Sequence, residues 1–169
     1  MPKYLIIILL FTRFLASASS PPQIVSSEIG INGLTCSLCS QSVEYALKQL
    51  PFIDKVEMNL SETTALIYFK GIGRVAPDQI AKAVQDAGFS LRYLNLNVVF
   101  DQQEEPCIEI ASYQYYLLST EQQTLNGTIS IQLLHQDFLS RKVFKQWKEK
   151  LQNTTPCHTT SNTYFAALL

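Results

Sequence analysis

The spacing of apolar residues between positions 29 and 93 alternates between the two periods that distinguish strands from helices. Strand-like alternation occurs in four stretches: residues 29–31, 56–60, 65–69 and 91–93. Helical spacing occurs in residues 43–50, between the first and second of these stretches, and in residues 80–87, between the third and fourth. This succession of periods predicts strand, helix, strand, strand, helix and strand.

Residues typical of turns and helix ends lie at the junctions that this pattern requires. Pro51 follows the first helix and stops it, and the short polar stretch 61–63 predicts a hairpin between the second and third strands. Pro77 and Asp78 open the second helix, which Gly88 ends. The order βαββαβ is the ferredoxin-like arrangement, an α+β fold in which two helices cover one face of a four-stranded antiparallel sheet.

The first eighteen residues have the three parts of a secretory signal peptide. Lys3 gives a positive start, residues 4–11 are an unbroken apolar run, and residues 16–18 form a small-x-small cleavage site. The run is too short for a bilayer anchor, which takes about 20 residues. We therefore expect a secreted or periplasmic protein without a transmembrane anchor after cleavage. An uncleaved anchor or a buried N-terminal strand are the alternatives.

Length and composition bound the remaining possibilities. The chain has 169 residues, too few for a complete (β/α)₈ barrel of about 250. Hydrophobic residues make up 47% of it, which excludes a disordered chain. A net charge of −1 argues against a nucleic-acid partner. We predict a first domain over residues 19–96 and a second, small α+β domain of unknown role over residues 97–169.

The pattern in the second half is less regular. It predicts strands over residues 107–118 and 128–134, a helix over residues 138–151, and a strand in the last ten residues. Asn126 and Gly127 form a dipeptide typical of turns.

Two thiols three positions apart carry the chemistry of this sequence. Cys36 falls in the loop after the first strand, and Cys39 falls at the start of the first helix. The positive end of a helix favours thiolates, which are ligands for Cu(I) and other soft metals. Two ligands leave the coordination of an ion incomplete. That suits an ion that is handed on and does not suit a structural zinc, which takes four ligands.

Residues 29–93 resemble the heavy-metal-associated domain of copper chaperones, metal-transporting P-type ATPases and periplasmic mercury-binding proteins. The family motif Gly-Met-Thr-Cys-x-x-Cys matches residues 33–39, with Leu34 in the Met position. Further matches are residues 50–51, 56–60 and 86–89. The resemblance implies that Cys36 and Cys39 bind one soft ion, that residue 34 packs under the loop, and that Phe89 lies near it.

The resemblance also implies a function. We expect an exported, non-enzymatic protein that captures or hands over a soft metal ion. Cu(I) is the first expectation, and Hg(II) or Zn(II) are alternatives. Partners would be a metal-transporting membrane protein or another metallochaperone. The first competing hypothesis is a thiol–disulfide redox protein that uses the same two cysteines, and the second is a purely structural interaction module.

Three further features are candidates of lower specificity. Cys107 and Cys157 are consistent with a disulfide. An auxiliary metal site with His158 and His135 is the alternative. Residues 141–151 form a basic amphipathic helix that either has an ordinary solvated face or docks on an acidic partner or a lipid surface. Glycosylation sequons begin at positions 59, 126 and 153.

Overall fold

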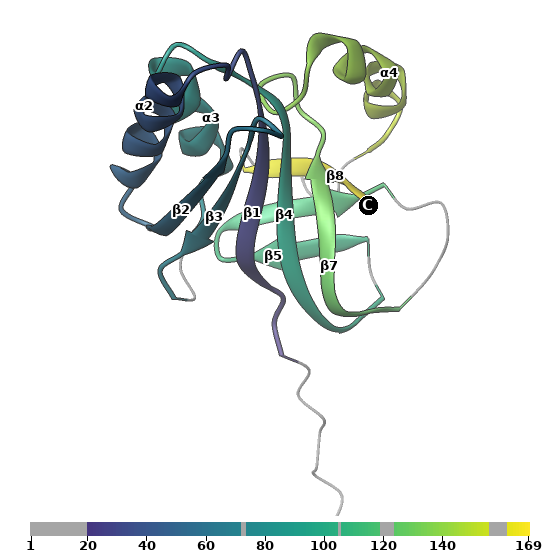
Figure 1. Ribbon diagram of the computed structural model, residues 1–169. Coiled ribbons are helices and arrows are strands. Elements are labelled where there is room, and N and C mark those ends of the chain that lie inside the picture. Colours follow the sequence, from purple (N-terminus) through teal and green to yellow (C-terminus); the bar gives the residue numbers. More distant parts are fainter. Residues whose placement is uncertain (1–19, 72–73, 105, 119–123, 156–161) are drawn as a thin grey trace, which may run out of the picture.

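The computed structural model describes residues 20–71, 74–104, 106–118, 124–155 and 162–169 (Figure 1). The predicted signal peptide, residues 1–18, lies outside the described residues. No helix in the described part of the chain has the length and apolar character needed to cross a bilayer.

The first half of the chain has the predicted βαββαβ order. Its elements are β1 (Gln23–Asn32), α2 (Ser37–Lys48), β2 (Ile53–Asn59), β3 (Thr64–Phe69), α3 (Pro77–Asp86) and β4 (Ser90–Gln103). The four strands are antiparallel in the order β2-β3-β1-β4, and the two helices cover one face of this sheet (Figure 1). The ferredoxin-like α+β prediction is confirmed.

The apolar positions that predicted these elements form their shared core. Ile29 and Ile31 of β1 are fully buried, as are Val43 and Leu47 of α2 and Ile80 of α3. Pro77 occupies the first turn of α3, where its missing N–H is not needed. The main-chain N–H of Gly88, whose φ is +90°, donates to the carbonyl of Gln85 and closes the helix.

The second half adds four strands and one helix. They are β5 (Cys107–Ile110), β6 (Tyr113–Leu117), β7 (Leu125–Leu133), α4 (Arg141–Gln152) and β8 (Thr163–Leu168). The single strand predicted over residues 107–118 is in fact a hairpin that turns at Ala111, whose φ is +57°. The predicted C-terminal strand is present as β8, which pairs parallel to β6 and antiparallel to β7. The helix begins at Arg141 rather than Phe138, which is fully buried below it.

Strand β4 joins the two halves into one sheet. It pairs with β1 along one edge and with β7 along the other, so the eight strands follow the order β2-β3-β1-β4-β7-β8-β6-β5. The predicted boundary between residues 96 and 97 falls inside this strand. A single cluster of buried side chains extends from Leu47 of α2, through Phe100 of β4, to Phe138. The two predicted domains therefore share a strand and a core.

The turn predicted at Asn126 and Gly127 is wrong, because both residues lie within β7. Gly127 pairs with Phe100, and the register between β4 and β7 shifts between Phe100 and Gln103. Gly127 has a φ of +80°. Glycine adopts this conformation without strain, whereas a residue with a side chain would be strained there. The dipeptide marks an irregularity in a strand pair and not a reversal of the chain.

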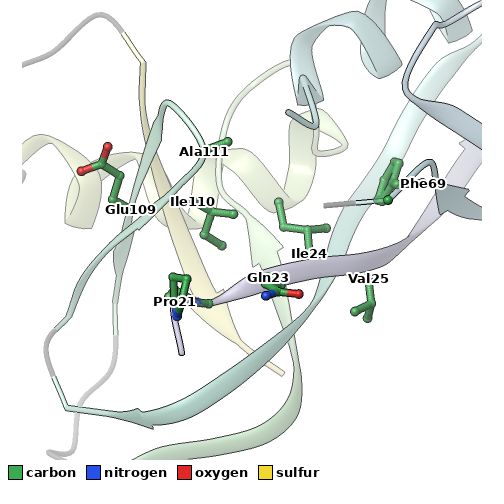
Figure 2. A pocket seen from close by; sticks show the side chains of 10 residues that line it. Pro21, Gln23, Ile24, Val25, Phe69, Glu109, Ile110 and Ala111 are labelled. Carbon is green, nitrogen blue, oxygen red and sulfur yellow. The ribbon is translucent and has the colours of Figure 1, made fainter. Parts of the chain in front are cut away.

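The far edge of the sheet curls back onto the first half. The guanidinium of Arg74, which precedes α3, donates from Nη2 to Oγ of Ser112 in the β5–β6 turn over 2.7 Å. A cleft of about 390 Å³ lies where the start of β1 faces the end of β5, with Ile24 on one side and Ile110 on the other (Figure 2). Glu109 is the one ionisable residue among the described residues that line it. The cleft lies at the end of β1 opposite to the two cysteines.

Three tyrosines stack beside the N-terminus of α3. Tyr164 lies with its ring centroid 5.5 Å from that of Tyr113 and 5.6 Å from that of Tyr115, and its hydroxyl donates to Oδ2 of Asp78. Burial raises the pKa of Tyr164, and its hydrogen bond to Asp78 raises that pKa further. Tyr115 is fully buried, and burial likewise raises its pKa. Its hydroxyl has no hydrogen-bond partner among the described residues.

This contrast predicts that a change from tyrosine to phenylalanine has opposite effects on stability at positions 115 and 164. Tyr115→Phe removes a buried polar atom without a partner, so we expect the free energy of unfolding to rise by about 1 kcal/mol. Tyr164→Phe removes a donor to a carboxylate, so we expect the free energy of unfolding to fall by about 1 kcal/mol. Urea denaturation of the two variants and the parent measures both. A loss of stability in Tyr115→Phe would mean that its hydroxyl has a partner.

Candidate metal centre

The loop between β1 and α2 takes its shape from Gly33 and Leu34. Gly33 has a φ of +79°, in the left-handed region that favours glycine, and it turns the chain away from the sheet after Asn32. The side chain of Leu34 is only 1% exposed and belongs to the core. Leu34 therefore fills the packing position under the loop that the family resemblance assigned to it.

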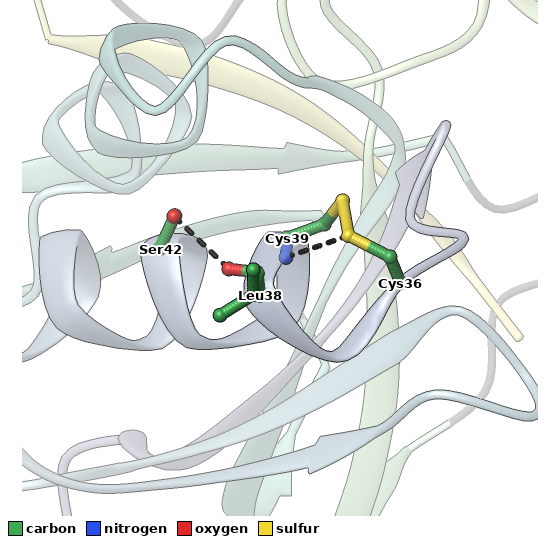
Figure 3. The surroundings of a disulfide bond; sticks show 4 residues. All are labelled: Cys36, Leu38, Cys39 and Ser42. Atoms are coloured by element: carbon green, nitrogen blue, oxygen red, sulfur yellow. Dashed lines mark hydrogen bonds between the residues drawn. A yellow bond between two sulfur atoms is a disulfide. The ribbon is translucent and has the colours of Figure 1, made fainter.

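Cys36 is the N-cap of α2, and Cys39 lies in the first turn of that helix. The main-chain N–H of Cys39 donates to Sγ of Cys36 over 3.0 Å (Figure 3). The sulfur thus takes the capping role that a serine or aspartate oxygen has in other helices. One turn further along the helix, Oγ of Ser42 donates to the carbonyl of Leu38 over 3.0 Å.

The two sulfurs converge. The Cα atoms of Cys36 and Cys39 are 5.1 Å apart, and the structure joins the two residues in a disulfide (Figure 3). Cys36 is exposed and Cys39 is half-buried. The motif therefore presents its sulfurs at the surface, within reach of another molecule.

The electrostatics of the helix start favour a negatively charged sulfur. A main-chain N–H already points at Sγ of Cys36, and the positive end of the α2 dipole lies at the same place. After reduction, the two cysteines would supply a pair of soft, anionic ligands to one ion. Leu38 between them is 74% exposed, so this surface also has an apolar contact point.

Phe89 supports the loop from the end of α3. A Cβ placed on Gly33 would lie 4.0 Å from Cδ1 of Phe89, so the ring packs beside the loop backbone. The main-chain N–H of Phe89 donates to the carbonyl of Val84, which holds the backbone of Phe89 at the end of the helix. The expected proximity of this aromatic residue to the cysteine loop is confirmed.

Of the other candidate ligands, Cys107 and His135 lie in the part of the chain that the structure describes. Cys107 is disulfide-bonded, and its expected partner Cys157 lies outside the described residues, as does His158. His135 is half-exposed, with Nδ1 3.3 Å from Oδ2 of Asp137. Among the described residues, no group of three or more His, Cys, Asp or Glu side chains is arranged to hold a metal ion.

One neighbour of the loop was missed by sequence reasoning. A cavity of about 400 Å³ is lined by Asn32 and Ser90, which adjoin Gly33 and Phe89, and by Asp137, Ser140 and Arg141 of the second half. The main-chain N–H of Ser140 donates to the carbonyl of Arg92 over 3.0 Å and holds the start of α4 there. No local sequence signal indicates this proximity, because it depends on the path of the chain after β7.

Residues 28–90 match the family of the heavy-metal-associated domain. Copper-transporting ATPase 1 of Mus musculus is 28% identical over 115 residues, which are 67% of this chain and 7% of the ATPase. Copper-transporting ATPase 1 of Rhizobium meliloti is 33% identical over 75 residues, which are 44% of this chain and 9% of that protein. The chain thus spans less than a tenth of the length of these two relatives.

Two solved structures are similar to part of the chain. A copper binding domain from HMA7, a P-type ATPase, is 29% identical with a TM-score of 0.37, and the match covers 43% of this chain and 93% of that domain. Oxidized MerP from Ralstonia metallidurans CH34 is 26% identical with a TM-score of 0.35, and the match covers 42% of this chain and 97% of MerP.

Proposed function

We propose, on the premise that residues 28–90 form a heavy-metal-associated domain, that the protein binds one Cu(I) ion between Cys36 and Cys39 and passes it on. The observation that carries the proposal is the convergence of two surface sulfurs at the N-terminus of α2. The two relatives described above are named as copper-transporting ATPases, which supports copper over other soft metals. The neighbour MerP leaves Hg(II) as the alternative ion.

Metal binding at this site begins with reduction of the disulfide. An external dithiol supplies two electrons and two protons, the bond between the sulfurs breaks, and two thiols form while the dithiol becomes a disulfide. Cu(I) then displaces the two protons and takes both thiolates as ligands. No third ligand comes from a cluster among the described residues, so a ligand from an acceptor has room to attack the ion.

We extend the proposal to location and partner. The features of residues 1–18 support export, and a membrane copper transporter is the acceptor that the names of the relatives support. In an oxidising compartment, the redox state of Cys36 and Cys39 would then decide whether the site takes up an ion.

A second function, thiol–disulfide exchange, is favoured by the disulfide itself. Titration of the reduced and the oxidised protein with Cu(I), against a Cu(I)-binding chelator of known affinity, distinguishes the two functions. We expect one Cu(I) per reduced molecule, none per oxidised molecule, and protection of both thiols from alkylation by the bound ion. Catalysed oxidation of a dithiol substrate without stoichiometric Cu(I) binding would establish the redox function instead.

A further inference from the structure

Helix α4 carries all the positive charge of the second half of the chain. Every lysine and arginine that follows Arg92 in the sequence lies in this helix: Arg141, Lys142, Lys145, Lys148 and Lys150. At 100° per residue, the first four of these fall within an arc of roughly 120° around the helix axis. We call these four residues the basic face of α4.

No described carboxylate neutralises the charges of the basic face. All four side chains are exposed, and none forms an ion pair with another described residue. Glu149 is the single acidic residue within the helix. By contrast, Lys48, Lys55 and Lys82 of the first half each pair with a carboxylate.

The apolar side of α4 is only partly covered. Val143, Phe144, Trp147 and Leu151 pack against a small cluster that includes Leu134 and Leu139, yet no residue of α4 is buried. Helices α2 and α3 differ, because they bury two and five residues. Trp147 therefore keeps part of its indole exposed at the flank of the helix, with Nζ of Lys150 5.4 Å from the ring centroid.

We propose that α4 docks the protein on an anionic phospholipid surface. A row of cations along a twelve-residue helix matches an extended layer of phosphate groups, and clusters of four or more basic residues on an amphipathic helix are typical of such binding. Tryptophan favours the interface between headgroups and acyl chains, which explains an indole left half-covered beside the cations. An acidic protein surface would pair with the charges of the basic face, but it would leave the exposed apolar flank of α4 in water.

Docking through α4 would bring the cysteine loop close to the bilayer. Arg141 begins the helix and shares a cavity with Asn32 and Ser90, the neighbours of Gly33 and Phe89. Figure 1 shows α4 and α2 at the same end of the sheet. The inference does not depend on metal binding, because the basic face contains none of the proposed ligands.

Vesicle binding tests the proposal with Trp147, the one tryptophan of the chain, as the probe. With vesicles of equal parts phosphatidylglycerol and phosphatidylcholine at low salt, we expect co-sedimentation, a blue shift of Trp147 emission and quenching by brominated lipid. Pure phosphatidylcholine vesicles should give none of these. Each cation near an anionic surface strengthens binding about fivefold, so K142Q/K145Q/K148Q should weaken binding about a hundredfold.

A control of equal charge separates α4 from the net charge of the protein. K48Q/K70Q/K82Q removes three exposed lysines outside α4 and should leave vesicle binding within about threefold of the parent. Circular dichroism and thermal melting of both triple variants establish that they are folded. Equal loss in the two variants would overturn the proposal. If the protein fails to bind vesicles but is retained on immobilised polyglutamate, the proposal is overturned in favour of an acidic protein partner. If it fails to bind vesicles but associates with itself through α4, the proposal is overturned in favour of a second copy of the chain.

Discussion

Replacement of both Cys36 and Cys39 by serine is expected to abolish stoichiometric Cu(I) binding by the reduced protein. Serine keeps the size of the side chain and the ability to cap α2, but its hydroxyl is a poor ligand for a soft ion. Each single variant keeps one thiolate and loses the second ligand held in place on the same loop. We expect affinity to fall about 10²- to 10⁴-fold in each single variant, as when one of two linked contacts is removed.

Competition with a Cu(I) chelator measures these affinities. Leu38→Ser is the matched control, because Leu38 lies between the two cysteines, is 74% exposed and supplies no sulfur. It should bind one Cu(I) with an affinity close to that of the parent. Unchanged affinity in the double serine variant would contradict the assignment of the two cysteines as ligands.

The second large effect concerns the shared core. Leu47→Ala in α2 removes a fully buried side chain and is expected to lower the free energy of unfolding by about 2–5 kcal/mol. The core that contains Leu47 extends across β4 as far as Phe138. Trp147 packs on a separate, smaller cluster in the other half of the chain, and if the two halves unfold together its transition should move by the same amount. Phe138→Ala, the reciprocal change, should lower the stability of the first half by about 3–5 kcal/mol.

Urea denaturation followed by circular dichroism and by Trp147 fluorescence gives both transitions. Leu38→Ala, at an exposed position, should change stability by no more than about 0.5 kcal/mol. A Trp147 transition that stays in place when Leu47 is truncated would mean that residues 19–96 and 97–169 unfold as two independent domains.

The first half of the fold could be predicted because its signals are local. Alternation at Ile29 and Ile31, helical spacing at Val43 and Leu47, and the glycine after α3 each report on a few neighbouring residues. The positions of Cys36 and Cys39 at a strand-to-helix junction followed from the same signals. Their role as ligands remains a prediction, since the structure holds them as a disulfide.

The second half depends on contacts between distant segments. Alternation in fact continues beyond Leu96 to Val98 and Phe100, which was a signal that the fourth strand crosses the predicted boundary. The pairing of β8 with β6 and β7 has no local signature, because strands that are distant in the sequence are brought together by the packing of the whole sheet. The cavity that Arg141 shares with Asn32 and Ser90 arises from that packing.

The central place of β4 also decides where this protein can meet another strand. In an isolated βαββαβ unit, β4 would be an edge with unpaired main-chain groups, open to strand addition by a second molecule. Here β7 occupies that edge over most of the strand. The outer strands that remain are β2, which carries Lys55 and Glu57, and the four-residue β5. Charged side chains and short length both discourage edge-to-edge aggregation. The added half of the chain therefore covers one edge of the first half's sheet, and the charged residues of β2 guard the other.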